Sequence, residues 1–166
     1  MSKPAERIGS GQPSEPVDAP TSERPQAHSI VMCSQAVMRF YAALDTGDID
    51  GVAALMAADG VWHRQGKALR GPAEVLAALR ERPPGRVTAH LVNNLVIDLD
   101  ASGQQATARY MLLVFRHDRA QPGDGPVPIA SSLLSITATT DHWRAAPNGD
   151  WLAVLKQGQT VFSQQV

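Results

Sequence analysis

The spacing of apolar residues changes halfway along this 166-residue chain, and that change limits the possible folds more than any other feature. Up to about residue 80 the apolar side chains recur at intervals of three and four, which is typical of helices that bury one face. From Val87 onwards the period is two, and the segments are rich in Val, Leu, Thr and aromatic residues, as in strands. Helices followed by strands predict an α+β domain in which the helices pack on one face of a sheet.

The first half of the chain predicts three helices. The first runs from near Ser29 to Gly47, and the second follows it almost directly and ends at Asp59-Gly60. The third begins at Gly71-Pro72, because proline is favoured in the first turn of a helix, and it ends before Pro83. The apolar stripe of the first helix contains Cys33, Val37, Phe40, Tyr41 and Leu44.

The second half predicts four long strands in an antiparallel meander. Turn signals rich in Gly, Pro, Asp and Asn separate these strands, and a shorter extended piece precedes the third helix. The expected strands are residues 87–99, 106–116, 131–144 and 151–162, with the shorter piece at residues 61–64. Their pattern predicts that Phe40, Leu44, Leu113 and Ile136 belong to the core.

The amino-terminal part differs in composition from the rest of the chain. It holds many Ser, Glu, Gln and Pro residues and hardly any apolar ones, so it cannot bury enough surface to offset the entropy lost on ordering. We therefore expect a disordered leader over residues 1–28. Residues 29–166 suit one domain with a single core.

The charge and the cysteine content argue against several classes of function. The formal net charge is −1, with 15 basic and 16 acidic residues, so nucleic acid is not an expected partner. No stretch approaches the roughly 20 apolar residues of a membrane span, and no secretory signal is evident, so we expect no membrane partner and a cytoplasmic location. The single cysteine, Cys33, excludes an intramolecular disulfide and is expected to be buried.

Motifs for cofactors and metals are also missing. The chain has no His-x-His or His-x-x-x-His pair, no Gly-rich phosphate loop and no Gly-x-Ser-x-Gly elbow. We therefore expect neither a metal nor a cofactor.

Three segments, taken in their order and spacing, resemble SnoaL-like proteins of the nuclear-transport-factor-2-like superfamily. They run from Trp62 to Pro72, from His90 to Asp98, and from Thr140 to Trp151. The resemblance extends over about Ser29 to Phe162. It implies a cone-shaped barrel, in which a curved, mostly antiparallel sheet wraps around the amino-terminal helices and encloses one pocket for a small hydrophobic ligand.

Relatives with this fold include polyketide cyclases, ketosteroid isomerases, scytalone dehydratase, limonene epoxide hydrolase and ring-dioxygenase small subunits. Others only bind ligands or partners, so the fold does not define the function. The sheet face outside the cone makes a homodimer the expected assembly.

His90 and Asp141 are the predicted catalytic residues. His90 and Asn94 fall on one face of an expected strand, and the resemblance places them on the family's His and Asn positions. An imidazole can exchange a proton at neutral pH, Asn94 can hold a substrate oxygen, and Asp141 can fix the tautomer of His90. The structural alternatives are a hydrogen-bonded His90 with Asn94 at a bulge, and an ion pair of Asp141 with Arg109 or Arg144.

Four aromatic residues are the remaining ligand-binding candidates. A Tyr hydroxyl can orient a carbonyl oxygen or a water, and a Trp ring can form a pocket wall. All four could instead be ordinary core residues. They are Tyr41, Trp62, Tyr110 and Trp143.

These residues predict a cofactor-free enzyme of the lyase or isomerase type, which uses a His/Asp proton shuttle in an apolar pocket. Dehydration, isomerisation and polyketide-type cyclisation can all begin by removing a proton beside a carbonyl. The first alternative is a non-catalytic module that binds a hydrophobic metabolite or a partner subunit. The second is the structural small subunit of a ring-hydroxylating oxygenase.

Overall fold

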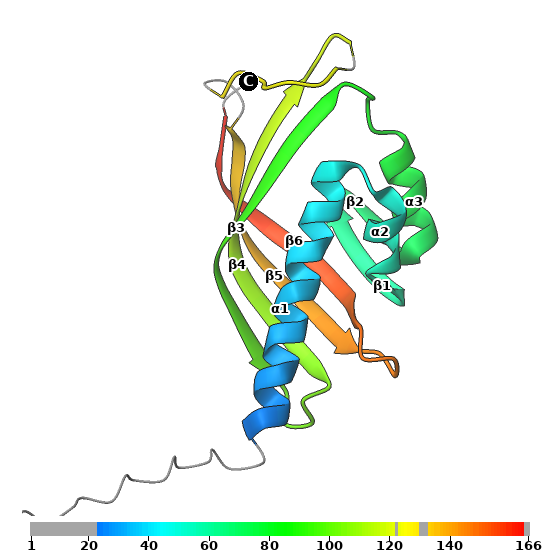
Figure 1. Ribbon diagram of the computed structural model, residues 1–166, viewed down its shortest axis with the longest axis vertical. Coiled ribbons are helices and arrows are strands. Elements are labelled where there is room, and N and C mark those ends of the chain that lie inside the picture. The colour runs from blue at the N-terminus through cyan, green and yellow to red at the C-terminus, as the bar shows by residue number, and fades with distance from the viewer. Residues whose placement is uncertain (1–22, 122, 130–132, 165–166) are drawn as a thin grey trace, which may run out of the picture.

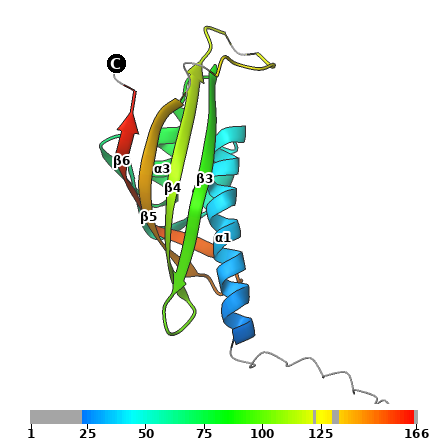
Figure 2. The same cartoon turned by 90° about the vertical axis from the view of Figure 1, so that its left-hand side faces the viewer.

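The helices lie on one side of a single curved sheet in the computed structural model, which describes residues 23–121, 123–129 and 133–164 (Figure 1). The long helix α1 runs along the concave side of the sheet, as Figure 2 shows from the side. Two shorter helices, α2 and α3, lie beyond it next to a small hairpin. The helices are α1 (Glu23–Thr46), α2 (Ile49–Ala54) and α3 (Gly71–Arg80).

Six strands form the sheet, in the order β2-β1-β6-β5-β4-β3. All neighbours are antiparallel except β1 and β6, which are parallel. The strands are β1 (Met56–Arg64), β2 (Lys67–Arg70), β3 (Arg86–Leu99), β4 (Gln105–Asp118), β5 (Leu133–Ala145) and β6 (Trp151–Ser163). The α+β class and the curved sheet are thus confirmed, although the strands leave an open cone rather than a closed barrel.

Two predicted boundaries were wrong. Helix α1 begins at Glu23, six residues before Ser29, while the rest of the expected leader lies outside the described residues. The second helix ends at Ala54, because Met56 already belongs to β1 and pairs with Ala153 of the parallel strand β6. Parallel pairing between segments so distant in sequence leaves no local signal in the pattern.

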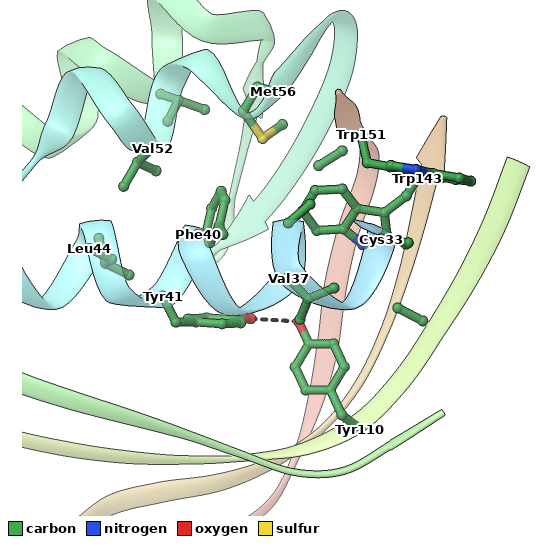
Figure 3. Close-up of a cluster of buried hydrophobic side chains, with 14 of the residues drawn as sticks. Cys33, Val37, Phe40, Tyr41, Leu44, Val52, Met56, Tyr110, Trp143 and Trp151 are labelled. Atoms are coloured by element: carbon green, nitrogen blue, oxygen red, sulfur yellow. Dashed lines mark hydrogen bonds between the residues drawn. The ribbon is translucent and has the colours of Figure 1, made fainter. Parts of the chain in front are cut away.

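The core fills the space between α1 and the sheet. Phe40 and Leu44 are buried there as predicted, at 0% and 5% exposure. Cys33 is also fully buried, and burial raises the pKa of its thiol to about 12, so it is not poised as a nucleophile. Figure 3 shows Cys33, Phe40 and Trp143 among these packed side chains.

The prediction that Leu113 and Ile136 are core residues was wrong. Leu112, next to Leu113, is buried against the core, and side chains alternate between the two faces of a strand. Leu113 therefore points to the outer face, where Ile136 is its cross-strand neighbour. Both are only half-buried. A period of two identifies a face of a strand, but it does not show which face is covered.

A bulge at Asn94 divides β3 into two parts. Asn94 has a φ of 55°, in the left-handed region that Asn tolerates better than most residues, and the register with β4 shifts between Asn93 and Val96. The extra residue reverses the alternation of side chains. From Thr88 to the bulge, the partly covered side chains are the even-numbered Thr88, His90 and Val92. After it, they are the odd-numbered Leu95, Ile97 and Leu99.

Candidate functional site

A cavity of about 260 Å³ opens between α1, the hairpin of β1 and β2, and the inner face of the sheet. Every long strand contributes to its wall, because the inner face of each carries a side chain at this level. The wall includes Tyr41 from α1, Trp62 from β1, His90 from β3, Leu112 from β4, Thr139 from β5 and Lys156 from β6.

His90 forms a dyad with Asp45 at one side of this cavity. Its ring Nδ1 lies 2.5 Å from Asp45 Oδ1, and its backbone N–H donates to Asp45 Oδ2 at 2.7 Å. Burial alone would raise the pKa of Asp45, but the hydrogen bonds from His90 outweigh it and hold that pKa below its usual value. An ionised Asp45 keeps the proton on Nδ1. The other ring nitrogen, Nε2, has no hydrogen-bond partner among the described residues.

A short chain of hydrogen bonds holds the dyad in place. Thr88 donates to Asp45 Oδ1 at 2.8 Å, and Arg82 donates to Thr88 Oγ1 at 2.9 Å. Arg82 also donates to the carbonyl of Leu44 at 2.7 Å. These contacts tie the last turn of α1 to the beginning of β3, so the position of Asp45 relative to His90 is defined by both elements.

A second polar cluster lies at the inner end of the cavity, where it is fully enclosed. Asp141 accepts hydrogen bonds from the Lys156 ammonium and, at 2.6 Å, from the Tyr110 hydroxyl. Tyr110 in turn lies 2.7 Å from the Tyr41 hydroxyl, the contact dashed in Figure 3. Exposure of Asp141 and Lys156 is 0% and 1%, which makes them a buried ion pair.

Aromatic rings surround the Lys156 ammonium. Its Nζ lies 4.2 Å from the ring centroid of Phe40, 4.9 Å from that of Tyr41 and 5.2 Å from that of Trp143. Burial lowers the pKa of Lys156, and the charge of Asp141 opposes that shift. Ring faces and a carboxylate together replace the water that a lysine normally keeps.

The predicted contact between His90 and Asp141 does not form. Asp45 occupies the place next to His90 that was expected for Asp141. The structural alternative for Asp141 is also wrong, because Arg109 pairs with Asp98 and Arg144 pairs with Asp59. Asp141 instead pairs with the Lys156 ammonium.

The structure places the predicted site residues in three different surroundings. His90, Tyr41, Trp62 and Asp141 lie on the cavity wall, and the roles proposed for them stay predictions. Asn94 was expected to share the face of His90, but the bulge leaves it exposed and away from the cavity wall. Tyr110 and Trp143 are buried at 4% and 1% exposure and support the cavity from behind without lining it.

Sequence reasoning did not find Asp45, Arg82, Thr88 or Lys156. Asp45 lies four residues after Tyr41 and therefore on the same side of α1, which is the one signal that could have suggested it. Lys156 stands in an alternating strand, where a lysine usually marks the exposed face. Within the described ranges, no three His, Cys, Asp or Glu side chains gather as a metal site would require.

The family model for the SnoaL-like domain matches residues 25–154, and the chain therefore belongs to this family. No curated protein matches the sequence. Among the helices that the structure describes, none has the length and apolar character needed to cross a membrane.

Solved structures share the fold at low sequence identity. A protein assigned as a scytalone dehydratase from Novosphingobium aromaticivorans is 16% identical, with 86% of this chain and 90% of that one covered and a TM-score of 0.69. A nuclear-transport-factor-2-like protein with a cystatin-like fold from the same species is 20% identical, with coverages of 88% and 92% and a TM-score of 0.66. A Catenulispora acidiphila protein in complex with S-DNPA is 21% identical, with coverages of 78% and 91% and a TM-score of 0.60. At such identities the similarity concerns the fold.

Proposed function

We propose that the chain is a cofactor-free enzyme of the lyase or isomerase type, in which His90 removes a proton from carbon beside a carbonyl group. The observation that supports this most is the dyad: a cavity-lining imidazole whose Nδ1 is bonded to a carboxylate at 2.5 Å and whose Nε2 has no described partner. Asp45 would stabilise the imidazolium that forms when Nε2 takes the proton, and it would also fix the ring orientation.

The cavity also offers a group for the oxygen that gains charge in this step. Thr139 lies on the cavity wall, and its buried hydroxyl has no hydrogen-bond partner in the described part of the chain. A hydroxyl that is already desolvated can donate to an enolate oxygen without first losing a water. Tyr41 is less suited to this task than expected, because its hydroxyl is bonded to Tyr110.

Proton removal can be tested without knowledge of the natural substrate. The protein is incubated in D₂O with a panel of enolisable aryl and alkyl ketones, and loss of the α-proton signal is followed by NMR. We expect exchange above the buffer rate for ketones that enter the cavity, and a rate near that of buffer for His90→Gln. Ketones that bind without any exchange would instead support the binding-module alternative.

We also propose that the chain forms a homodimer through the outer face of the sheet. Leu91, Leu113, Ile136 and Phe162 are cross-strand neighbours in one row over four strands. Leu91 and Phe162 are 49% and 64% exposed. The row holds no charge that would repel a second copy, and a two-fold axis allows it to pack on itself.

Light scattering coupled to size-exclusion chromatography tests this assembly. We expect the mass of a dimer for the unmodified chain and of a monomer for the double variant Leu91→Glu, Phe162→Glu. Both side chains are exposed, so the monomer should keep its fold, which circular dichroism can check. A monomeric unmodified chain, or a variant that stays dimeric, would contradict the proposal.

A further inference from the structure

Four arginines line the part of the cavity away from the Asp141–Lys156 pair. They are Arg64, Arg82, Arg86 and Arg116. Asp118 accepts two hydrogen bonds from Arg86, at 2.7 and 3.1 Å, and it also pairs with Arg116 at 2.8 Å. One carboxylate is thus shared by two guanidinium groups and cannot neutralise both.

The other two arginines contact no carboxylate within the described ranges. Arg82 donates to two backbone carbonyls and to the Thr88 hydroxyl. Among the residues that the structure describes, Arg64 donates only to the side-chain oxygen of Gln65, at 3.5 Å. The cavity wall and its immediate partners therefore carry five cationic groups, including Lys156, against the carboxylates of Asp45, Asp118 and Asp141.

Arg64 is the guanidinium best placed to receive a ligand. It is half-buried, and its Cζ lies 5.4 Å from the ring centroid of Trp62, which also lines the cavity. Burial lowers the pKa of Arg64, and the nearby charges of Arg86 and Arg82 lower it further. Burial and the neighbouring positive charges both destabilise the charged form of Arg64, and a bound anion would offset both effects.

We propose that the cavity binds its ligand as a carboxylate, which pairs with Arg64 while the apolar part of the ligand extends along Trp62 towards His90. A guanidinium presents a planar fork that matches the two oxygens of a carboxylate. The donors of Arg82 are already taken by two carbonyls and a hydroxyl, whereas those of Arg64 are mostly free of partners among the described residues. One such guanidinium suits one carboxylate better than a phosphate dianion, which needs more donors. The cavity, at about 260 Å³, lies at the small end of ligand sites and suits an acid with one or two rings.

The inference rests on the proposed function only in sharing its cavity, and it is tested by binding rather than turnover. Matched pairs serve as probes: benzoate and benzamide, cinnamate and cinnamamide, 2-naphthoate and 2-naphthamide. Each pair differs in charge but hardly in shape. Calorimetry gives the dissociation constants, and the tryptophan fluorescence, to which the cavity-lining Trp62 contributes, gives a second signal.

We expect the best acid to bind at least about 10-fold more tightly than its amide, with added salt weakening only the acid. Arg64→Gln should remove most of this preference and leave amide binding unchanged. Arg64→Lys should restore only part of it, because the charge returns without the fork. Arg109→Gln is the matched control, since Arg109 is exposed and pairs with Asp98 away from the cavity, and it should change nothing.

Two outcomes would overturn the inference. One is that acids bind no better than amides, or show no binding up to about 10 mM. The other is that Arg64→Gln, shown by circular dichroism to be folded, keeps the full preference. The unmodified protein separates this inference from the proposed function: a preference for acids in a protein that catalyses no proton exchange supports the carboxylate site alone.

Discussion

Lys156→Met should lower the free energy of unfolding by about 3–5 kcal/mol, because the substitution leaves the buried Asp141 carboxylate without its cation. Methionine nearly matches the length of the lysine stem and can pack against Phe40 and Trp143, so loss of packing should add little. Urea denaturation followed by Trp fluorescence measures the change. The matched control is Lys67→Met on β2, whose side chain is exposed and which should shift stability by less than about 0.5 kcal/mol.

The double variant Lys156→Met, Asp141→Asn separates the ion pair from packing. With both charges removed, the introduced amide oxygen can still accept the hydrogen bond from Tyr110, so the double variant should be more stable than Lys156→Met alone. The losses of unfolding free energy in the two single variants should therefore add up to roughly 1–3 kcal/mol more than the loss in the double variant. Additive losses, or a Lys156→Met variant as stable as the control, would show that the ammonium is not stabilised by Asp141.

Asp45→Asn should lower the rate of proton exchange by about 10²- to 10⁴-fold, nearly as much as His90→Gln. The asparagine amide would donate to Nδ1 and place the imidazole proton on Nε2, so the ring could no longer accept a proton from the ligand. Ketone exchange in D₂O is the measurement. Combining the two substitutions should add little, because each removes the same function.

Two further variants make this test specific. Asp59→Asn removes an exposed carboxylate that pairs with Arg144, and it should leave the exchange rate unchanged. Asp141→Asn should act mainly on stability. If Asp141→Asn abolished exchange in folded protein while Asp45→Asn did not, the partner expected from the sequence would be the functional one after all.

The sequence predicted the layered fold well because the change of period needs no information about contacts. The third helix and the four long strands could be read from local residues in this way. The parallel pairing of β1 with β6 could not, since it joins Met56 to Ala153 and no turn connects them.

The candidate site was predicted in part. His90 could be placed on the cavity wall because its neighbours on the strand alternate regularly up to the bulge. Its partner could not, because the choice between Asp45 and Asp141 depends on where the end of α1 meets β3, a contact across 45 residues. Lys156 was missed for a different reason: only the tertiary structure supplies the rings and the carboxylate that let a lysine be buried.

The bulge at Asn94 has a consequence for how this domain can vary. Before it, β3 supplies Thr88 and His90 to the cavity; after it, Leu95 and Ile97 pack into the core that holds α1. On the neighbouring strand β4, Arg116 lines the cavity, Leu112 and Val114 belong to both the cavity wall and the core, and Ala106 and Ala108 belong to the core. Substitutions in the first part of β3 can therefore change what the cavity accepts while Leu95 and Ile97 continue to pack in the core, whereas the Asp141–Lys156 pair serves both the cavity wall and stability.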